Sequence, residues 1–152
     1  ARGVSQKERE KTSLHYIKEV GLLGFEDKYP HQLSGGMRQR TGLARALTVN
    51  SDILLMDEPF SAVDEQMRRK LQEDLLNLLK IESKTVIFVT HSIEEAVYLA
   101  DQVVILSGRP GSIADIVYPE IDRQGEIDLI RRQPRYMELV DEIWSSLKRY
   151  VE

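Results

Sequence analysis

Three short runs of apolar residues, separated by segments of helical periodicity, constrain the fold of this chain most strongly. The runs cover residues 53–56, 85–89 and 103–106, and none of them alternates between apolar and polar side chains. Strands of this kind are typical of parallel sheets in which both faces are covered by helices. The sequence therefore predicts an α/β fold with three parallel strands that are buried beneath helices.

Helical segments precede, separate and follow these runs, and several of them begin with a capping residue. Ser5 and Glu8 have the spacing of a capping box, before a helix that we expect to end near Gly21. Ser34 is placed to cap a helix that continues to about Val49. Ser92 and Glu95 have the spacing of a second capping box, before a helix expected to continue to about Ala100. Further helices are expected over residues 67–79 and 134–150.

A turn and a second extended segment follow the third apolar run. Residues 108–111 have the composition of a turn, which predicts that 103–106 pairs with 113–118 as an antiparallel edge. A polar linker after Pro119 then leads to the last helix. We expect the apolar face of that helix, which includes Trp144, to pack against the sheet or the hairpin.

Charge and residue usage exclude several classes of protein. The net charge of −4, from 21 basic and 25 acidic residues, argues against a chain whose main task is to neutralise nucleic-acid phosphates. The sequence has no cysteine, which excludes disulfides and thiolate metal sites. No stretch approaches the roughly 18 apolar residues of a membrane span, so any membrane role must come through a partner.

Two of the predicted strands are followed by residues that carry chemistry. Asp57 and Glu58 follow the first strand, and His91 follows the second. Parallel sheets place their sites at the carboxyl ends of the strands. There Asp57 could hold Mg²⁺ together with phosphate oxygens, Glu58 could activate a water that attacks phosphorus, and His91 could hydrogen-bond a terminal phosphate. The alternatives are that the acidic pair caps a helix and that the histidine is a capping or core residue.

Ser34, Gly35 and Gly36 stand directly before the second helix and suggest an anion site. Helix N-termini present free N–H groups and a partial positive charge, and glycine lets a phosphate come close because no Cβ intervenes. Arg38 and Arg40 either add positive potential there or are solvated. The alternative for the glycines is an ordinary glycine-rich loop before a capped helix.

Four short segments between residues 33 and 91 follow one another in an order that is known from one family. Residues 33–37 read Leu-Ser-Gly-Gly-Met, 53–59 read Ile-Leu-Leu-Met-Asp-Glu-Pro, 61–64 read Ser-Ala-Val-Asp, and 89–91 read Val-Thr-His. They resemble the LSGGQ signature, the Walker B strand, the D-loop and the switch-histidine loop of the ATP-binding-cassette (ABC) ATPases. The resemblance implies ATP and Mg²⁺ as ligands.

In that family two cassettes pair head to tail and enclose two ATP molecules. The signature of one subunit closes over the γ-phosphate of the ATP that the other subunit holds. The resemblance therefore implies that Ser34, Gly35, Gly36 and Met37 bind ATP in trans.

The resemblance also implies roles for the residues after the strands. Asp57 would hold Mg²⁺ through water, Glu58 would polarise the attacking water, and His91 would contact the γ-phosphate. Ser61 and Asp64 would lie at the dimer interface.

Within the family, the sequence is most similar to the ATPases of nitrate, sulfonate and taurine importers. Phe60, the segment 94–96 and the turn at 108–111 carry this likeness. It implies a second ATPase subunit and a transmembrane permease as partners, a solute-binding protein as an indirect one, and no nucleic acid. It also implies a cytoplasmic protein on the inner face of the cell membrane.

The sequence departs from the family pattern in two places. Met37 stands where the signature usually has glutamine, which affects a side-chain contact but not the backbone anion site. The P-loop motif G-x-x-x-x-G-K-[ST] is missing, because no glycine is followed by lysine, and the glutamine loop is missing too. We therefore expect a fragment, similar to the C-terminal part of a cassette, that neither binds ATP well nor hydrolyses it alone. Its exposed strand edges should lead it to self-associate.

The expected fold is thus a partial P-loop NTPase (ABC ATPase) fold of the α/β class. Residues 1–50 would belong to the helical subdomain, 51–118 to the C-terminal part of the α/β core, and 119–152 to a linker and helix. Two alternatives to an importer ATPase are a truncated cassette that donates only its signature and an ABC-type DNA-repair ATPase. The latter proteins have long heptad coiled coils before the signature, for which residues 4–20 are too short.

Overall fold

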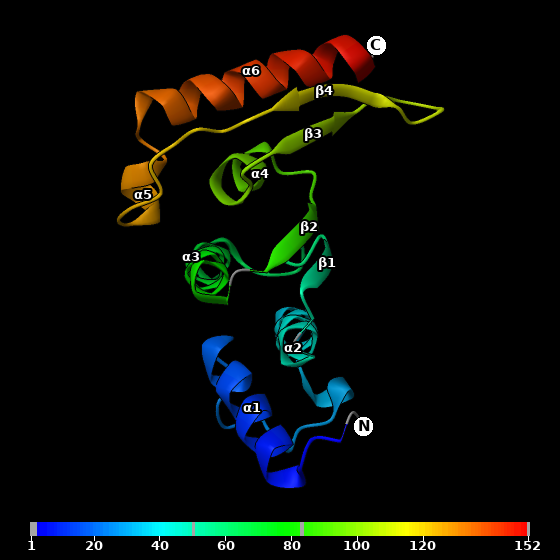
Figure 1. The fold of residues 1–152 in the computed structure, drawn as a ribbon, viewed down its shortest axis with the longest axis vertical. Coiled ribbons are helices and arrows are strands. Elements are labelled where there is room, and N and C mark those ends of the chain that lie inside the picture. Colours follow the sequence, from blue (N-terminus) through cyan, green and yellow to red (C-terminus); the bar gives the residue numbers. More distant parts are fainter. Residues whose placement is uncertain (1–2, 50, 83, 152) are drawn as a thin grey trace. The chain divides into compact units, whose positions relative to one another are not determined.

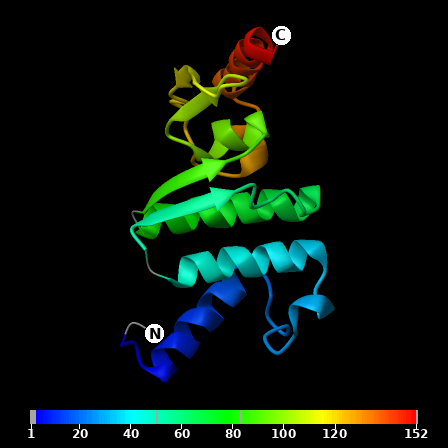
Figure 2. The same cartoon turned by 90° about the vertical axis from the view of Figure 1, so that its right-hand side faces the viewer.

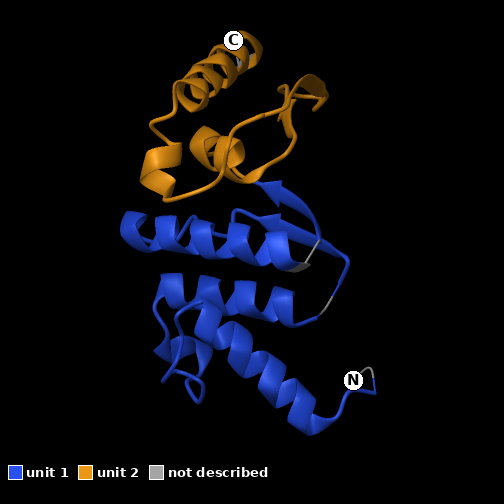
Figure 3. Cartoon of the chain, turned by 60° about the vertical axis from the view of Figure 1, so that its left-hand side comes forward, with its two compact units in different colours: residues 1–89 blue, residues 90–152 orange. Residues whose placement is uncertain are grey.

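The computed structural model describes residues 3–49, 51–82 and 84–151, which form two compact units. The first unit comprises residues 1–89 and the second residues 90–152 (Figure 3). The division into 1–50, 51–118 and 119–152 stays a prediction, and its boundary at residue 50 lies outside the described residues.

The first unit combines helices with one parallel pair of strands. Strands β1 and β2 pair with Ile53 opposite Thr85 and Asp57 opposite Val89, which confirms the predicted parallel pairing. Figure 2 shows α2 and α3 side by side, with β1 and β2 next to α3. The elements of this unit are α1 (Gln6–Glu19), η1 (Pro30–Gln32), α2 (Gly35–Thr48), β1 (Ile53–Asp57), α3 (Glu65–Glu82) and β2 (Thr85–Val89) (Figure 1).

Serine caps fix the start of three helices, as the sequence predicted. In each case the serine hydroxyl accepts a hydrogen bond from the backbone N–H three residues later, which satisfies one of the free amides of the first turn. The pairs are Ser5 with Glu8, Ser34 with Met37, and Ser92 with Glu95.

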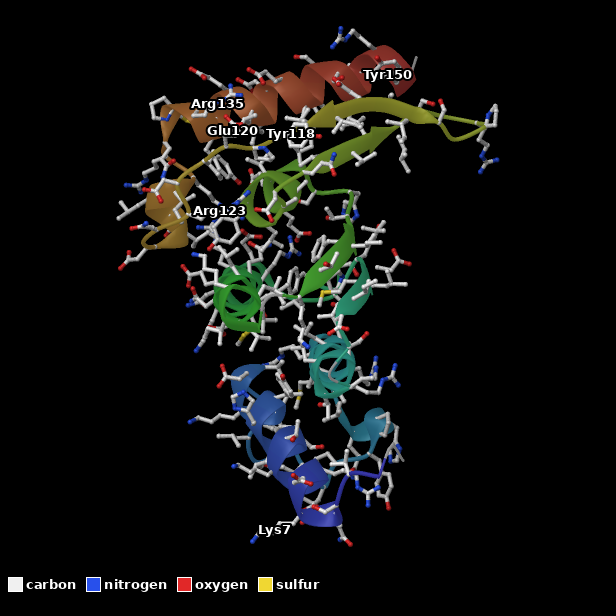
Figure 4. The ribbon with its side chains drawn as sticks, in the orientation of Figure 1. Lys7, Tyr118, Glu120, Arg123, Arg135 and Tyr150 are labelled. Carbon is white, nitrogen blue, oxygen red and sulfur yellow. The ribbon has the colours of Figure 1, made fainter. Side chains whose placement is uncertain are left out.

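The second unit combines helices with an antiparallel hairpin. β3 pairs with β4, with Val103 opposite Val117, and this confirms the predicted edge hairpin. Arg123, on the segment between β4 and α5, donates hydrogen bonds to Asp101 and to the carbonyl of Ala100 (Figure 4). The elements are α4 (Ile93–Leu99), β3 (Val103–Leu106), β4 (Ile113–Val117), α5 (Ile127–Ile130) and α6 (Pro134–Val151).

The prediction that the third strand joins the parallel sheet is wrong. Among the described residues β1 pairs with β2 and β3 pairs with β4, in two separate two-stranded sheets. A continuous apolar run indicates burial but does not specify which strand lies beside it. The short connection through residues 108–111 gives β3 a neighbour at a low cost in loop entropy.

The predicted burial of β1 and β2 on both faces is also wrong. Leu54 and Met56 are buried, whereas Leu55 is 73% exposed and Ile53 is 56% exposed. Side chains alternate along a strand, and residues that are opposite each other in a pair point the same way. The exposed positions Ile53, Leu55, Ile87 and Val89 therefore form one apolar surface, the open face of β1–β2.

The last helix is correctly predicted in length, and the predicted apolar residues Leu139 and Ile143 are buried, but the prediction for Trp144 is wrong. Trp144 is 52% exposed, and the ammonium group of Lys148 lies 5.2 Å from the centre of its ring. The buried side chains of this helix are three or four residues apart, which puts them on one face of the helix. Trp144 directly follows the buried Ile143 in sequence and therefore points to one side of that face. The buried residues of α6 are Tyr136, Leu139, Ile143 and Ser146.

Helix α5 falls in the segment that was predicted to be a polar linker. Its side chains Ile127 and Ile130 are buried, which explains why this short helix forms. Across the described part of the chain, no helix is both long enough and apolar enough to cross a membrane.

Tyr136 gives a stability prediction for the second unit. Its hydroxyl donates to the carbonyl of Glu94 at 2.9 Å, and Arg131 forms an ion pair with the Glu94 carboxylate at 3.3 Å. Burial raises the pKa of Tyr136 from 10.0 to about 12, against a smaller opposing effect of the Arg131 charge. The raised pKa favours the neutral phenol, so this stabilisation is complete below about pH 10 and is lost as the pH rises through about 12.

We expect Tyr136→Phe to lower the free energy of unfolding by about 1 kcal/mol at pH 7, because the Glu94 carbonyl loses its donor. Urea denaturation between pH 9 and 12 should show a steeper loss of stability in the wild type than in the variant. Equal pH dependence of the two proteins would contradict this account.

Candidate functional site

The N-terminus of α2 presents the amides that the sequence assigns to an anion site. Ser34 is the N-cap residue, and its hydroxyl accepts from the N–H of Met37 at 3.2 Å. Gly35 and Gly36 follow in the first turn, whose N–H groups have no acceptor within an α-helix. Ser34 and Gly35 are exposed, and Gly36 is half-buried.

The two glycines differ in what surrounds them. A Cβ on Gly36 would lie 3.2 Å from the carbonyl oxygen of Ala62 and 3.8 Å from the Cα of Val63. A Cβ on Gly35 would meet nothing closer than 4.0 Å. Gly36 thus permits the close packing of α2 against the loop after β1, whereas packing within the chain does not require a glycine at position 35.

Arg38 and Arg40 have structural partners. Arg38 donates to the carbonyl of Leu33 at 2.6 Å, and Arg40 donates to the carbonyls of Val20 and Gly21, each at 3.0 Å. The guanidinium group of Arg40 thus lies at the C-terminal end of α1, where the helix dipole favours positive charge. Arg40 therefore ties α2 to α1.

Asp57 and Glu58 stand at the end of β1. Asp57 is the last residue of the strand and points to the same side as the open face of β1–β2. Glu58 has a φ of 43°, in the left-handed region that residues other than glycine seldom adopt. Its N–H donates to the carbonyl of Val89 at 2.9 Å, so the contact between β1 and β2 continues one residue past the strand. Unusual backbone of this kind clusters at functional sites.

The segment 58–64, the loop after β1, is held by apolar anchors and by a helix cap. Phe60 is buried, and its ring lies 5.8 Å from that of Phe88. Asp64 accepts a hydrogen bond from the N–H of Met67 at 3.0 Å and so caps α3. Ser61 and Asp64 are exposed, and their place at a dimer interface stays a prediction.

Gln39 joins α2 to this loop and was not identified from the sequence. Its side-chain Nε2 donates to the carbonyl of Glu58 at 2.7 Å and to the hydroxyl of Ser61 at 3.1 Å. Its Oε1 accepts from the N–H of Ala62 at 2.7 Å. The contacts span 19 to 23 residues of sequence, so no local pattern points to them.

His91 lies in the second unit, two residues after the end of β2. It is exposed, and hydrogen bonds order the backbone on either side of it. The hydroxyl of Thr90 donates to the buried carboxylate of Glu95 at 2.6 Å and accepts from the N–H of Ser92 at 3.0 Å. The sequence-predicted residues that the structure brings together are those of the first unit. The N-terminus of α2, with Ser34 and Gly36, lies next to the loop after β1, which begins at Glu58.

Within the described residues, no group of three or more histidine or acidic side chains could hold a metal ion by itself. Mg²⁺ in phosphate-binding sites is held by one or two carboxylates together with substrate phosphates and waters. One exposed carboxylate at the end of a parallel strand, as in Asp57, fits that kind of site.

Comparison with known proteins identifies relatives that match up to 97% of this chain. Residues 2–61 match the family model described as ABC transporter. An uncharacterized ABC transporter ATP-binding protein of Methanocaldococcus jannaschii is 47% identical over 151 residues, which cover 97% of this chain and 57% of that protein. The taurine import ATP-binding protein TauB of Rhizobium johnstonii is 44% identical over 149 residues, which cover 95% of this chain and 57% of that protein.

A third relative and a solved structure agree with this assignment. The nitrate import ATP-binding protein NrtD of Synechocystis is 40% identical over 151 residues, which cover 96% of this chain and 57% of that protein. A dimeric ATP-binding cassette in a post-hydrolysis state, bound to ADP and Pi, superposes with a TM-score of 0.70 at 34% identity. That match covers 79% of this chain and 51% of the cassette.

The chain spans 57% of the length of these three curated relatives. Its parallel strands and helices form part of the P-loop NTPase fold of the ABC cassettes, as the sequence predicted. The chain belongs to the family of ABC transporter ATP-binding proteins.

Proposed function

We propose that this chain is part of the ATP-hydrolysing subunit of an ABC-type solute importer, similar to those for nitrate, sulfonate and taurine. One observation carries the proposal: the chain presents an exposed, capped helix N-terminus at Ser34 and a carboxylate, Glu58, directly after a parallel strand. The Gln39 contact holds these two elements in a fixed relation, so that each can serve a different ATP in a head-to-tail pair. A phosphate-binding turn and a carboxylate at the end of a parallel strand are the parts that phosphoryl transfer to water requires.

In this proposal the N-terminus of α2 binds the γ-phosphate of an ATP held by a second, head-to-tail subunit. Ser34 and the amides of Gly35 and Gly36 supply donors and the positive end of the helix dipole. Because Gly36 is packed against Ala62, Gly35 is the glycine that leaves room for a phosphate. Met37 replaces the usual glutamine, but its backbone N–H already serves the Ser34 cap.

The residues after β1 and β2 act on the ATP of their own subunit in this proposal. Asp57 holds Mg²⁺ through water, and the ion neutralises charge that develops on the phosphates. Glu58 orients and polarises the attacking water, and His91 contacts the γ-phosphate. Ser61 and Asp64 lie at the interface with the second subunit.

The partners follow from the importer assignment, which the taurine and nitrate import relatives support. A transmembrane permease receives the ATPase on the inner face of the membrane, and a solute-binding protein delivers the solute to the permease. The residues of this chain carry no P-loop lysine, so we infer that the 152-residue chain by itself binds ATP weakly and does not hydrolyse it.

Replacing Glu58 tests the proposed reaction. In the protein produced from its own gene, Glu58→Gln should lower Mg²⁺-dependent ATP hydrolysis at least ~100-fold while ATP binding is retained, because the water loses its base. Glu120→Gln, at an exposed position in the second unit, is the matched control and should hydrolyse ATP like the wild type.

Two results would contradict the proposal. Hydrolysis that Glu58→Gln leaves unchanged would remove Glu58 from the reaction. Saturable hydrolysis by the 152-residue chain alone, abolished by Glu58→Gln, would show that the chain does not need a P-loop lysine.

The adjacent glycines give a prediction that separates packing from phosphate binding. Gly36→Ala should lower the free energy of unfolding by about 1–3 kcal/mol, because the new Cβ presses on the Ala62 carbonyl. Gly35→Ala should leave stability unchanged or raise it by up to about 1 kcal/mol.

Gly35→Ala should nevertheless reduce ATP hydrolysis on the order of tenfold or more, because its methyl group displaces the phosphate. Urea denaturation and steady-state hydrolysis on the same preparations check both effects. Full activity in Gly35→Ala would contradict a phosphate site at this turn.

A further inference from the structure

We infer that Gln39 is a positioning residue for Glu58, and that its side-chain amide keeps Glu58 in the conformation needed for hydrolysis. This inference rests on the proposed function, in which Glu58 acts on the attacking water. It goes further because it assigns a role to a side chain outside the four family motifs.

Both ends of the Gln39 amide are used. The NH₂ group donates to the Glu58 carbonyl at 2.7 Å and to the Ser61 hydroxyl at 3.1 Å, while the carbonyl oxygen accepts from the Ala62 N–H at 2.7 Å. The Ser61 hydroxyl also lies 3.1 Å from the Glu58 carbonyl. Only a side chain with a donor and an acceptor at this length can make these contacts, so aliphatic and carboxylate side chains cannot.

The left-handed backbone of Glu58 needs such support. A residue with a Cβ is disfavoured at a φ of 43°, because the Cβ comes too close to the following carbonyl oxygen. The hydrogen bond from the Glu58 N–H to Val89 holds the peptide before Glu58. Three donors hold the carbonyl after it: the Gln39 amide at 2.7 Å, the Ser61 hydroxyl at 3.1 Å and the Ser61 N–H at 3.2 Å. Of these three donors, Gln39 makes the shortest contact and alone comes from outside the loop. Without it the loop loses its tie to α2, and a return of Glu58 to a negative φ, which displaces the carboxylate, becomes easier.

Helix α2, which carries Gln39, is itself held firmly in place. Its start is fixed by the Ser34 cap, and Arg40, the next residue after Gln39, is held by the carbonyls of Val20 and Gly21. Gly36, about one turn before Gln39, lets the helix approach the loop closely enough for the amide to reach. The geometry therefore points to positioning through a rigid helix rather than to an incidental surface contact.

The test compares Gln39→Glu, Gln39→Met and wild type in the protein produced from its own gene. Gln39→Glu keeps an acceptor for the Ala62 N–H but has no donor for the Glu58 carbonyl, and Gln39→Met has neither. Gln66→Glu, at an exposed position on α3, is the matched control for the added charge.

Both Gln39 variants should lower kcat at least about tenfold, while the KM for ATP changes less than about twofold. Hydrogen exchange at the Ala62 amide should become faster in Gln39→Met, where its acceptor is lost, and exchange in the core of α3 should remain slow. Gln66→Glu should leave all three quantities at wild-type values. Partial unfolding would also lower the apparent kcat at an unchanged KM, so slow exchange in the core of α3 is the observation that separates positioning from loss of folded protein.

Different results would overturn the inference and the proposed function. If Glu58→Gln abolishes hydrolysis but both Gln39 variants keep the wild-type kcat, the positioning role is wrong and the proposed function stands. If the Gln39 variants lose activity only in step with faster exchange throughout the protein, Gln39 is structural alone. If hydrolysis does not depend on Glu58 at all, the proposed function fails and the positioning role with it.

Discussion

The hydrogen bond from the Glu58 N–H to the Val89 carbonyl is the interaction on which the site depends. It extends the parallel pairing of β1 and β2 by one residue and determines where the loop after β1 begins. From this point the chain takes a left-handed turn, buries Phe60 beside Phe88, and presents the Ala62 N–H to Gln39. The strand pair therefore determines where α2 can pack, and α2 carries the proposed phosphate-binding turn.

The open face of β1–β2 is the second consequence of this short strand pair. Parallel sheets normally have both faces covered, yet Leu55 and Ile87 are 73% and 56% exposed on this one. Asp57 lies at the end of the same face, so the proposed Mg²⁺ ligand borders an apolar surface. An uncovered apolar face beside a strand edge supports the expectation that the 152-residue chain self-associates.

Local patterns in the sequence predicted the elements well, but contacts between elements much less. The serine caps at Ser34 and Ser92 and the parallel pairing of β1 with β2 could be predicted because short-range hydrogen bonds and apolar runs specify them. The neighbour of β3 and the exposure of Trp144 could not, because both depend on packing between segments. The motif residues were identified by resemblance, whereas the Gln39 contact spans too many residues for any local pattern to reveal it.

The central claim is that the α2 N-terminus of one subunit acts on ATP held by another. Mixing two impaired variants of the protein produced from its own gene, Glu58→Gln and Gly35→Ala, tests it most directly. In a mixed head-to-tail dimer, one site combines an intact Glu58 with an intact Gly35 turn, so ATP hydrolysis should reappear on mixing and saturate as the subunits exchange. Hydrolysis that stays at the level of the separate variants, after subunit exchange has been demonstrated, would contradict the claim.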